Sequence, residues 1–169
     1  MARDRDRGAG TEGARGIEAL ERFLEEQGVG YETLEHEQTF SATAEARVVG
    51  VAPDHAAKTM LLREGEDYRV AVIPGSHRLD MHKARQALGA SSKLRLATED
   101  EMDSDFAAFE VGALPPFGPL LPAPEIVDRR LLEHERILCT GGDHRHSVLI
   151  DPEELARVAD ARLADICED

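Results

Sequence analysis

The 169-residue chain has no tryptophan, two cysteines and few aromatic residues of any kind, at 4%. Single-stranded nucleic acids stack on aromatic side chains, so an extended stacking surface is excluded. Cys139 and Cys167 match no metal-binding or redox spacing. No run reaches the roughly 18 to 20 apolar residues that a membrane span requires. We therefore expect free thiols in a reducing compartment, a cytoplasmic protein and no membrane partner.

Positive charge is also scarce, because 20 lysines and arginines face 34 acidic residues, which gives a net charge of −14 at pH 7. Contact with phosphates needs local positive charge, so we expect no DNA partner and only a local pocket for any RNA. Residues 1–16 carry glycine, arginine and aspartate but almost nothing to bury, which predicts a disordered tail. Residues 17–169 then form a single domain of ordinary size.

Hydrophobic periodicity divides the rest of the chain into helices and strands. Helical spacing predicts helices over 17–27, 41–49, 81–88 and 152–166, and a short helix that begins at residue 99. Asp80, Thr98 and Asp151 would cap the third helix, the short helix and the last helix. Alternating or continuous apolar runs predict strands at 31–36, 57–63, 68–73, 93–96, 126–128, 136–140 and 147–150, with a hairpin joining the second and third. The strands outnumber the helices without strict alternation. This favours an α+β fold with helices packed around a mixed sheet or barrel.

Lys58 is one of only three lysines and lies within the strand predicted at 57–63. Alternation along the strand places it on the same face as Met60 and Leu62. A lysine on an apolar face is either partly desolvated or paired with an anion, which suits catalysis or phosphate binding. The structural alternative is a lysine whose stem packs while its ammonium group reaches water.

Residues 112–124 hold five prolines and two glycines, which predicts a structured loop. Gly112 and Pro116 define a Gly-x-x-x-Pro pattern within it. Such a loop can hold backbone amides and carbonyls in fixed positions facing a ligand. A rigid connection over the core would use the same residue types.

Two further segments carry histidines. His36 lies between two glutamates, where it would serve as a base, an orienting partner or a structural residue. A glycine pair at 141–142 would let the backbone approach a substrate, or form a plain tight turn. His144 and His146, with Asp143 and Cys139 nearby, suggest a metal-dependent hydrolase, but the His-x-His pair lacks a third ligand at firm spacing. We therefore expect no metal and no cofactor.

The order of these segments is informative. The segments that carry a family resemblance are, in chain order, Leu34-Glu35-His36, Ala57-Lys58-Thr59-Met60-Leu61, Leu79–Lys83 with Ala87–Ala90, Gly112 with Pro116, Thr140-Gly141-Gly142, and Leu163–Ile166. Over roughly residues 17–166 the chain resembles the YbaK/ProX family of trans-editing aminoacyl-tRNA deacylases, and the similar editing domain inserted in bacterial prolyl-tRNA synthetases. The resemblance implies a mixed, partly barrel-like sheet surrounded by helices.

The resemblance also implies a metal-independent, substrate-assisted reaction without a protein nucleophile. Lys58 would hold the terminal phosphate or ribose and stabilise the charged transition state. The backbone at Gly112 would position the reacting hydroxyl or water. The implied substrate-binding residues are His36, Thr59, Pro116, Gly141, Gly142 and Ser147. The implied partners are the acceptor end of aminoacyl-tRNA and a prolyl-tRNA synthetase.

The segment Asp143–Ser147 replaces a more basic, glycine-containing stretch found in the best-known members of that family. This difference leaves open which small non-cognate residue, such as cysteine or alanine on proline tRNA, would be removed. Two alternatives stay open from the sequence. One is a non-catalytic module that binds tRNA or a synthetase, and the other is the metal-dependent hydrolase.

Overall fold

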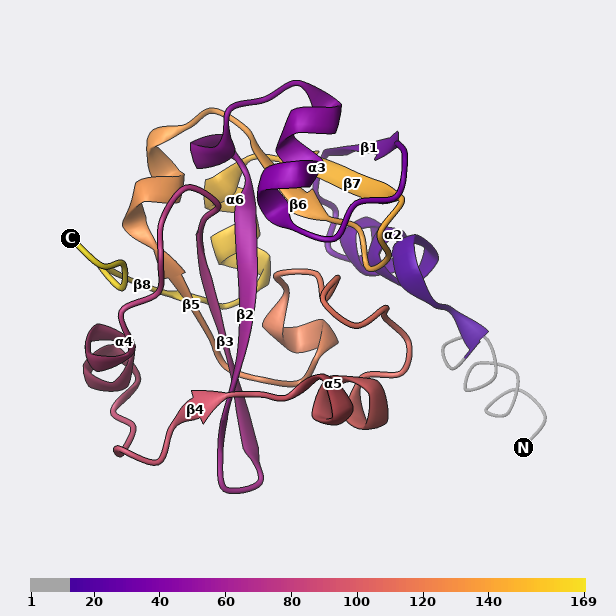
Figure 1. Ribbon diagram of the computed structural model, residues 1–169. Helices are drawn as coiled ribbons and strands as arrows, with labels where there is room; N and C mark the ends of the chain where they lie inside the picture. The colour runs from indigo at the N-terminus through magenta and orange to yellow at the C-terminus, as the bar shows by residue number, and fades with distance from the viewer. Residues whose placement is uncertain (1–12) are drawn as a thin grey trace.

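The structure is a computed structural model that describes residues 13–169 (Figure 1). Residues 1–12, which make up most of the predicted tail, lie outside the described residues. The helices are α2 (Gly16–Glu26), α3 (Ala42–Val49), α4 (Met81–Leu88), α5 (Glu99–Asp105) and α6 (Pro152–Val158), with short 3-10 turns η1 (Pro53–His55), η2 (Gly118–Leu120) and η3 (Arg129–Glu133). The strands are β1 (Tyr31–Glu35), β2 (Ala57–Glu64), β3 (Asp67–Pro74), β4 (Arg95–Leu96), β5 (Glu125–Asp128), β6 (Ile137–Thr140), β7 (His146–Ile150) and β8 (Arg162–Ala164).

The strands form two sheets. The larger sheet has the order β4-β2-β3-β5-β8, and the smaller has the order β1-β7-β6. The long hairpin of β2 and β3 is antiparallel, whereas β3 with β5 and β5 with β8 are parallel. An isolated parallel bridge between Ala56 and Leu138 joins the edges of the two sheets. The expected mixed α+β fold is therefore confirmed, as two sheets rather than a closed barrel.

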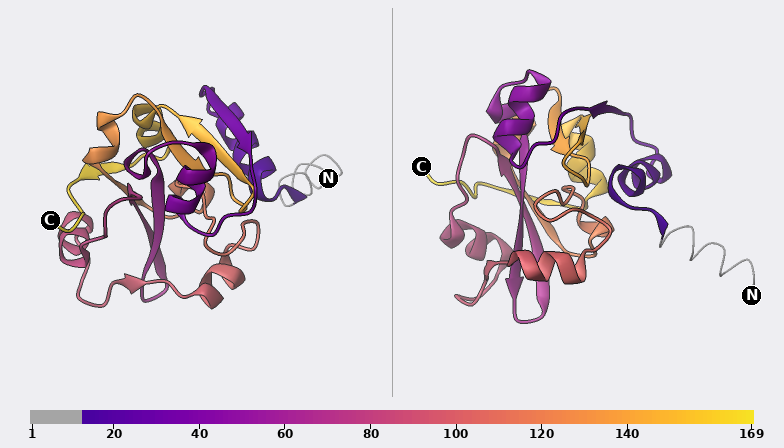
Figure 2. Two further views of the ribbon diagram at one scale, coloured as in Figure 1. Left: turned by 45° about the horizontal axis from the view of Figure 1, so that its top comes forward. Right: turned by 45° about the vertical axis from the view of Figure 1, so that its right-hand side comes forward.

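Alternation along the central hairpin produces two separate cores. Val70 and Val72 point toward one cluster, whereas Ala71 and Ile73 point toward another. Successive side chains of a strand face opposite sides of its sheet, so each face needs its own cover. Helix α4 packs on the second face, and α2 and α6 contribute to the first cluster. Figure 2 shows α2 and α4 on opposite sides of the hairpin.

The end of the chain differs from the sequence-based prediction. Helix α6 stops at Val158, and Asp160 follows with a positive φ of 51°. Residues 162–164 then pair with β5 as strand β8, so the helix predicted through residue 166 is wrong. The apolar positions Leu163 and Ile166 fit helical spacing, but a left-handed residue at 160 breaks the helix before them.

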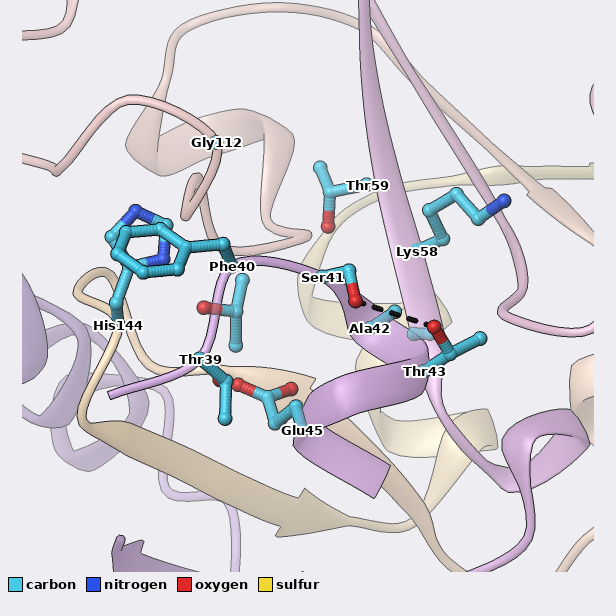
Figure 3. Close-up of a pocket in the computed structure, with 12 residues that line it drawn as sticks. Thr39, Phe40, Ser41, Ala42, Thr43, Glu45, Lys58, Thr59, Gly112 and His144 are labelled. Carbon is cyan, nitrogen blue, oxygen red and sulfur yellow. Dashed lines mark hydrogen bonds between the residues drawn. The ribbon is translucent and has the colours of Figure 1, made fainter. Parts of the chain in front are cut away.

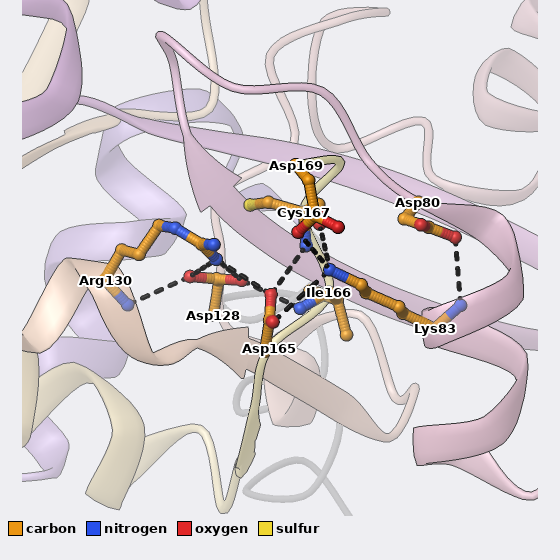
Figure 4. A network of polar contacts seen from close by, with 8 residues as sticks. All are labelled: Asp80, Lys83, Asp128, Arg130, Asp165, Ile166, Cys167 and Asp169. Atoms are coloured by element: carbon orange, nitrogen blue, oxygen red, sulfur yellow. Dashed lines mark hydrogen bonds and ion pairs between the residues drawn. The ribbon is translucent and has the colours of Figure 1, made fainter.

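A polar network fixes this last segment to the larger sheet (Figure 4). Asp128 is fully buried and accepts hydrogen bonds from the backbone N–H of Ile166 at 2.8 Å and from that of Arg130 at 2.9 Å. The Arg130 guanidinium bridges Asp128 to Asp165, and the ammonium group of Lys83 donates to the carbonyl of Cys167 at 2.8 Å. Buried charge is satisfied here by several partners, as it must be in a low-dielectric core.

The start of the described chain also packs on the domain. Ala14 and Gly16 are buried, and the Gly16 N–H donates to the carbonyl of Ala108 at 2.8 Å. The first helix thus begins one residue earlier than expected. None of the helices in residues 13–169 has the length and apolar character that crossing a membrane demands.

Candidate active site

A cavity of about 300 Å³ opens where α3, the start of β2 and the loop at Gly112 meet. Figure 3 shows its lining side chains arriving from these separate parts of the chain. Most of them are polar. The lining residues are Thr39, Phe40, Ser41, Ala42, Thr43, Glu45, Ala57, Lys58, Thr59, Gly112, Thr140 and His144. Of the eight site residues expected from the sequence, the structure brings Lys58, Thr59 and Gly112 together here.

Lys58 lies at the edge of this cavity. It shares the strand face of Met60 and Leu62, as predicted, and its ammonium group donates a hydrogen bond to the carbonyl oxygen of His77 at 3.1 Å. Figure 3 shows its Nζ directed away from Thr59, which occupies the other face of β2. A neutral carbonyl leaves the lysine charge uncompensated, so an anionic group would be the stronger partner.

Thr59 and Gly112 both line the cavity. The hydroxyl of Thr59 is buried and has no hydrogen-bond partner among the described residues. Gly112 has a φ of +83°, a left-handed conformation in which a side chain would be strained. An unsatisfied hydroxyl beside an exposed backbone turn can accept hydrogen bonds from a ligand and donate one to it.

His144 holds the Gly112 loop in place. Its Nε2 lies 2.8 Å from the carbonyl oxygen of Val111, and its backbone N–H donates to Glu110 at 2.9 Å. The ring of Phe40, which is 72% exposed, packs against it with ring centroids 4.9 Å apart. His144 is therefore a positioning residue for the loop. From the sequence, a metal ligand at this place was an alternative that the missing third ligand argued against.

His36 and Ser147 lie behind the cavity rather than in its lining. The His36 Nε2 is 2.6 Å from the Ser147 hydroxyl and 3.8 Å from a carboxylate oxygen of Glu45. Burial raises the pKa of Glu45 to about 7, a hydrogen bond from Ser147 lowers it, and the negative charge of Asp143 raises it. Only Glu45 of this polar cluster reaches the cavity.

Pro116, Gly141 and Gly142 also lie outside the lining. Pro116 is buried within its loop. A side chain at Gly141 would meet the His146 carbonyl at 2.8 Å, and one at Gly142 would meet Phe109 at 2.8 Å. The glycine pair thus allows close packing against the neighbouring chain, which is the tight-turn alternative. None of the three is among the lining residues, and the expectation that they bind substrate stays a prediction.

A comparison with known families identifies the domain. The sequence model of the aminoacyl-tRNA editing domain matches residues 36–158, which is most of the chain. The chain belongs to the aminoacyl-tRNA editing domain family. Every segment that lines the cavity lies within the matched residues. The family resemblance stated from the sequence is confirmed.

Solved structures agree with this assignment of the editing domain. A proposed trans-editing enzyme for prolyl-tRNA synthetase is 28% identical, with a TM-score of 0.79 over 89% of this chain and 95% of that one. The hypothetical protein APE2540 is 26% identical, with a TM-score of 0.80 over 88% and 99%. A proposed signal transduction protein from Marinobacter aquaeolei VT8 is 20% identical, with a TM-score of 0.68 over 89% and 30%, and shows the fold alone.

The editing domain offers poor candidates for a nucleophile of its own. Burial raises the pKa of the Cys139 thiol well above its ordinary value, and that of Cys167 to about 12. Reactive cysteines need the opposite shift. The Ser147–His36 contact resembles a nucleophile with its base, but Ser147 is 0% exposed and is absent from the cavity lining.

Among residues 13–169, one group of side chains could surround a metal ion. The ligand atoms of Asp54, His55 and His134 lie within 4.8 Å of one another, and the two imidazole rings are tilted by 35° with centroids 3.9 Å apart. None of the three lines the cavity. The set suggested by the sequence at 143–146 is not gathered, because His146 pairs with Asp143 at 2.9 Å while the His144 ring turns to the Gly112 loop.

Sequence reasoning missed the segment 39–45, which supplies half of the lining. Glu45 carries a signal that could have found it. Ala42, Ala46 and Val49 form the inward face of α3, and Glu45 lies on that same face. A carboxylate on the apolar face of a helix is costly to bury, so its presence there indicates a polar site.

Proposed function

We propose that this editing domain is a free-standing deacylase that removes a small non-cognate amino acid, such as cysteine or alanine, from proline tRNA. Water adds across the ester bond and releases the free amino acid and a tRNA with a free terminal hydroxyl. Family membership supports the aminoacyl-tRNA substrate, and the likeness to a proposed trans-editing enzyme supports proline tRNA. Aminoacyl-tRNA of this kind is met in the cytoplasm, where a prolyl-tRNA synthetase would be a second partner.

The meeting of Lys58, Thr59 and Gly112 around one cavity carries this proposal. The volume of about 300 Å³ suits a small aminoacyl group and part of its terminal ribose. Lys58 would exchange the His77 carbonyl for the terminal phosphate or ribose. A charge-assisted contact of that kind is stronger than the neutral one it replaces.

Hydrolysis would be assisted by the substrate. The backbone at Gly112 would position a ribose hydroxyl or a water beside the ester carbonyl, and the free hydroxyl of Thr59 would hydrogen bond with the same group. The inert, buried thiols and the enclosed Ser147 support a route without a protein nucleophile. No metal takes part in this scheme.

A deacylation panel tests the proposal. Proline tRNA charged separately with cysteine, alanine, serine and proline is incubated with the wild type, with Lys58→Ala and with Lys93→Ala. Lys93 is an exposed lysine away from the cavity and serves as the matched control. We expect release of one or two small non-cognate residues, a loss of about a hundredfold to a thousandfold in Lys58→Ala, and full activity in Lys93→Ala.

Two results would contradict the proposal in different ways. Normal turnover in a folded Lys58→Ala variant would remove the role of Lys58. An absence of turnover on every charged tRNA, together with capture of a synthetase by the wild type, would favour the binding module instead. The net charge of −14, which disfavours tight tRNA binding, is the reason for testing the binding-module hypothesis as well.

A further inference from the structure

Glu45 is an acidic side chain in an unusual position. It lies in the first turn of α3, is 4% exposed, and still forms part of the cavity wall. No lysine or arginine of residues 13–169 forms an ion pair with it, and its one ionic neighbour is the His36 imidazole, 3.8 Å away. Buried charges in proteins are normally paired. The charged form of the carboxylate therefore has no cationic side chain in the described part of the chain to stabilise it, and a bound cation would do so.

On the protein side, Glu45 accepts a hydrogen bond from Ser147 but has no lysine or arginine partner among the described residues. His36 already directs its Nε2 at the Ser147 hydroxyl, 2.6 Å away, and its Nδ1 lies 2.6 Å from the backbone oxygen of Glu37. Asp143 adds negative charge nearby rather than positive charge. The side that remains available to a ligand is the cavity itself.

We propose that the Glu45 carboxylate binds the α-ammonium group of the aminoacyl ester. The site then accepts esters with a free amino group and rejects those whose nitrogen is acylated, such as peptidyl esters. This inference rests on the proposed deacylase function and names the substrate class of the same site. A free α-amino group has a pKa near 7.7 to 8.0, so it is largely protonated at neutral pH.

The charge pattern of the cavity supports this orientation. Lys58 on β2 offers a positive group at one edge, and Glu45 on α3 offers a negative group elsewhere on the wall, as Figure 3 shows. The acceptor end of an aminoacyl-tRNA has the complementary pattern, with a phosphate on one side of the ribose and an ammonium group on the other. An N-acylated ester loses the charge and adds bulk beside the buried carboxylate. A hydroxyl in place of the amine would also leave the carboxylate unpaired.

Two measurements with matched ligands test the inference. The first compares deacylation of alanyl-, lactyl- and N-acetylalanyl-tRNA by the wild type and by Glu45→Gln. We expect the wild type to prefer the alanyl ester by about tenfold to a hundredfold. Glu45→Gln should lose most of that preference by slowing the alanyl ester alone. Equal preference in the two proteins would overturn the inference.

The second measurement does not depend on turnover. Calorimetric titration compares the affinities of two ligands. One is 3′-deoxy-3′-(alanylamino)adenosine, which has a stable amide in place of the ester, and the other is its N-acetyl derivative. Tighter binding of the free amine by the wild type, and equal binding by Glu45→Gln, supports the inference even if the deacylase proposal fails. Equal binding of the two ligands by the wild type, or no binding of either, overturns it.

Control variants separate this role from a structural one. Glu37→Gln removes an exposed carboxylate nearby and should change neither ratio. Glu45→Asp keeps the charge and should retain part of the preference for the free amine, which a purely structural role would not require. Unfolding curves for each variant establish that the compared proteins are folded.

Discussion

Glu45 should make the fold less stable as the pH rises. Its pKa is about 7 in the folded chain against an ordinary value of 4.5, chiefly because burial disfavours the charged carboxylate. Between these two values the folded state keeps a proton that the unfolded state has lost. Stability therefore falls from about pH 4.5 to about pH 7 and stays level beyond. Glutamine has the same shape and no charge, so Glu45→Gln should remove this part of the pH dependence.

The size of the effect follows from the two pKa values. A rise from 4.5 to about 7 on folding corresponds to about 3 kcal/mol of lost stability once both states are ionised. We expect Glu45→Gln to match the wild type near pH 4.5 and to exceed it by about 3 kcal/mol at pH 8. His36, Ser147, Asp143 and Cys139 face the same site and are present in both proteins.

Urea unfolding at a series of pH values measures this difference directly. Glu125 is also buried, and its pKa is raised well above the ordinary value, so the wild type has a second source of the same trend. Subtracting the two curves cancels Glu125 and leaves Glu45. Parallel curves for the wild type and Glu45→Gln between pH 5 and 8 would refute the assignment of an ionising carboxylate at this place.

Four further outcomes follow from the structure. Gly142→Ala should cost more than about 2 kcal/mol in urea unfolding, because its side chain would meet Phe109 at 2.8 Å, whereas Gly28→Ala, which has open space around it, should cost about 1 kcal/mol. Asp128→Ala should cost about 3 kcal/mol and expose residues near 166 to amide exchange. Activity should survive treatment with a chelator, as a deacylation assay in EDTA would show. Affinity for uncharged tRNA should be weak and fall only gradually with salt, because few phosphate contacts release few counterions, and a filter-binding titration checks this.

Local patterns predicted the elements whose formation depends on their own residues. The hairpin of β2 and β3 follows from alternating apolar positions around the turn at Gly65, and the capping box of Thr98 and Glu101 starts α5 as expected. Strand β8 could not be predicted in this way. Leu163 lies on a helical stripe in the sequence, and only pairing with β5 makes the segment extended.

At the candidate site, too, local features could be predicted from the sequence and long-range contacts could not. The position of Lys58 on a strand and the Gly-x-x-x-Pro loop were visible in the sequence, and the fold places Lys58 and the glycine of that loop, Gly112, at one cavity. The residues around His144 offered a metal site only as a discounted alternative, and nothing in the sequence indicated the role that His144 has in the structure. Its actual partner, the Val111 carbonyl, is 33 residues away in the chain. Contacts over such distances depend on the tertiary packing, which spacing does not reveal.

The net charge of −14 and a polyanionic substrate are reconciled by where the charges lie. A tRNA that must be released after one ester is cut gains nothing from a broad basic surface, because contacts to phosphates hold substrate and product equally. In the proposed scheme the buried Glu45 carboxylate would act on the aminoacyl group, which is the part that differs between charged and uncharged tRNA, while Lys58 would add a single contact at the cavity edge. The stability that Glu45 costs the fold would thus serve discrimination, since only a ligand bearing an ammonium group relieves it.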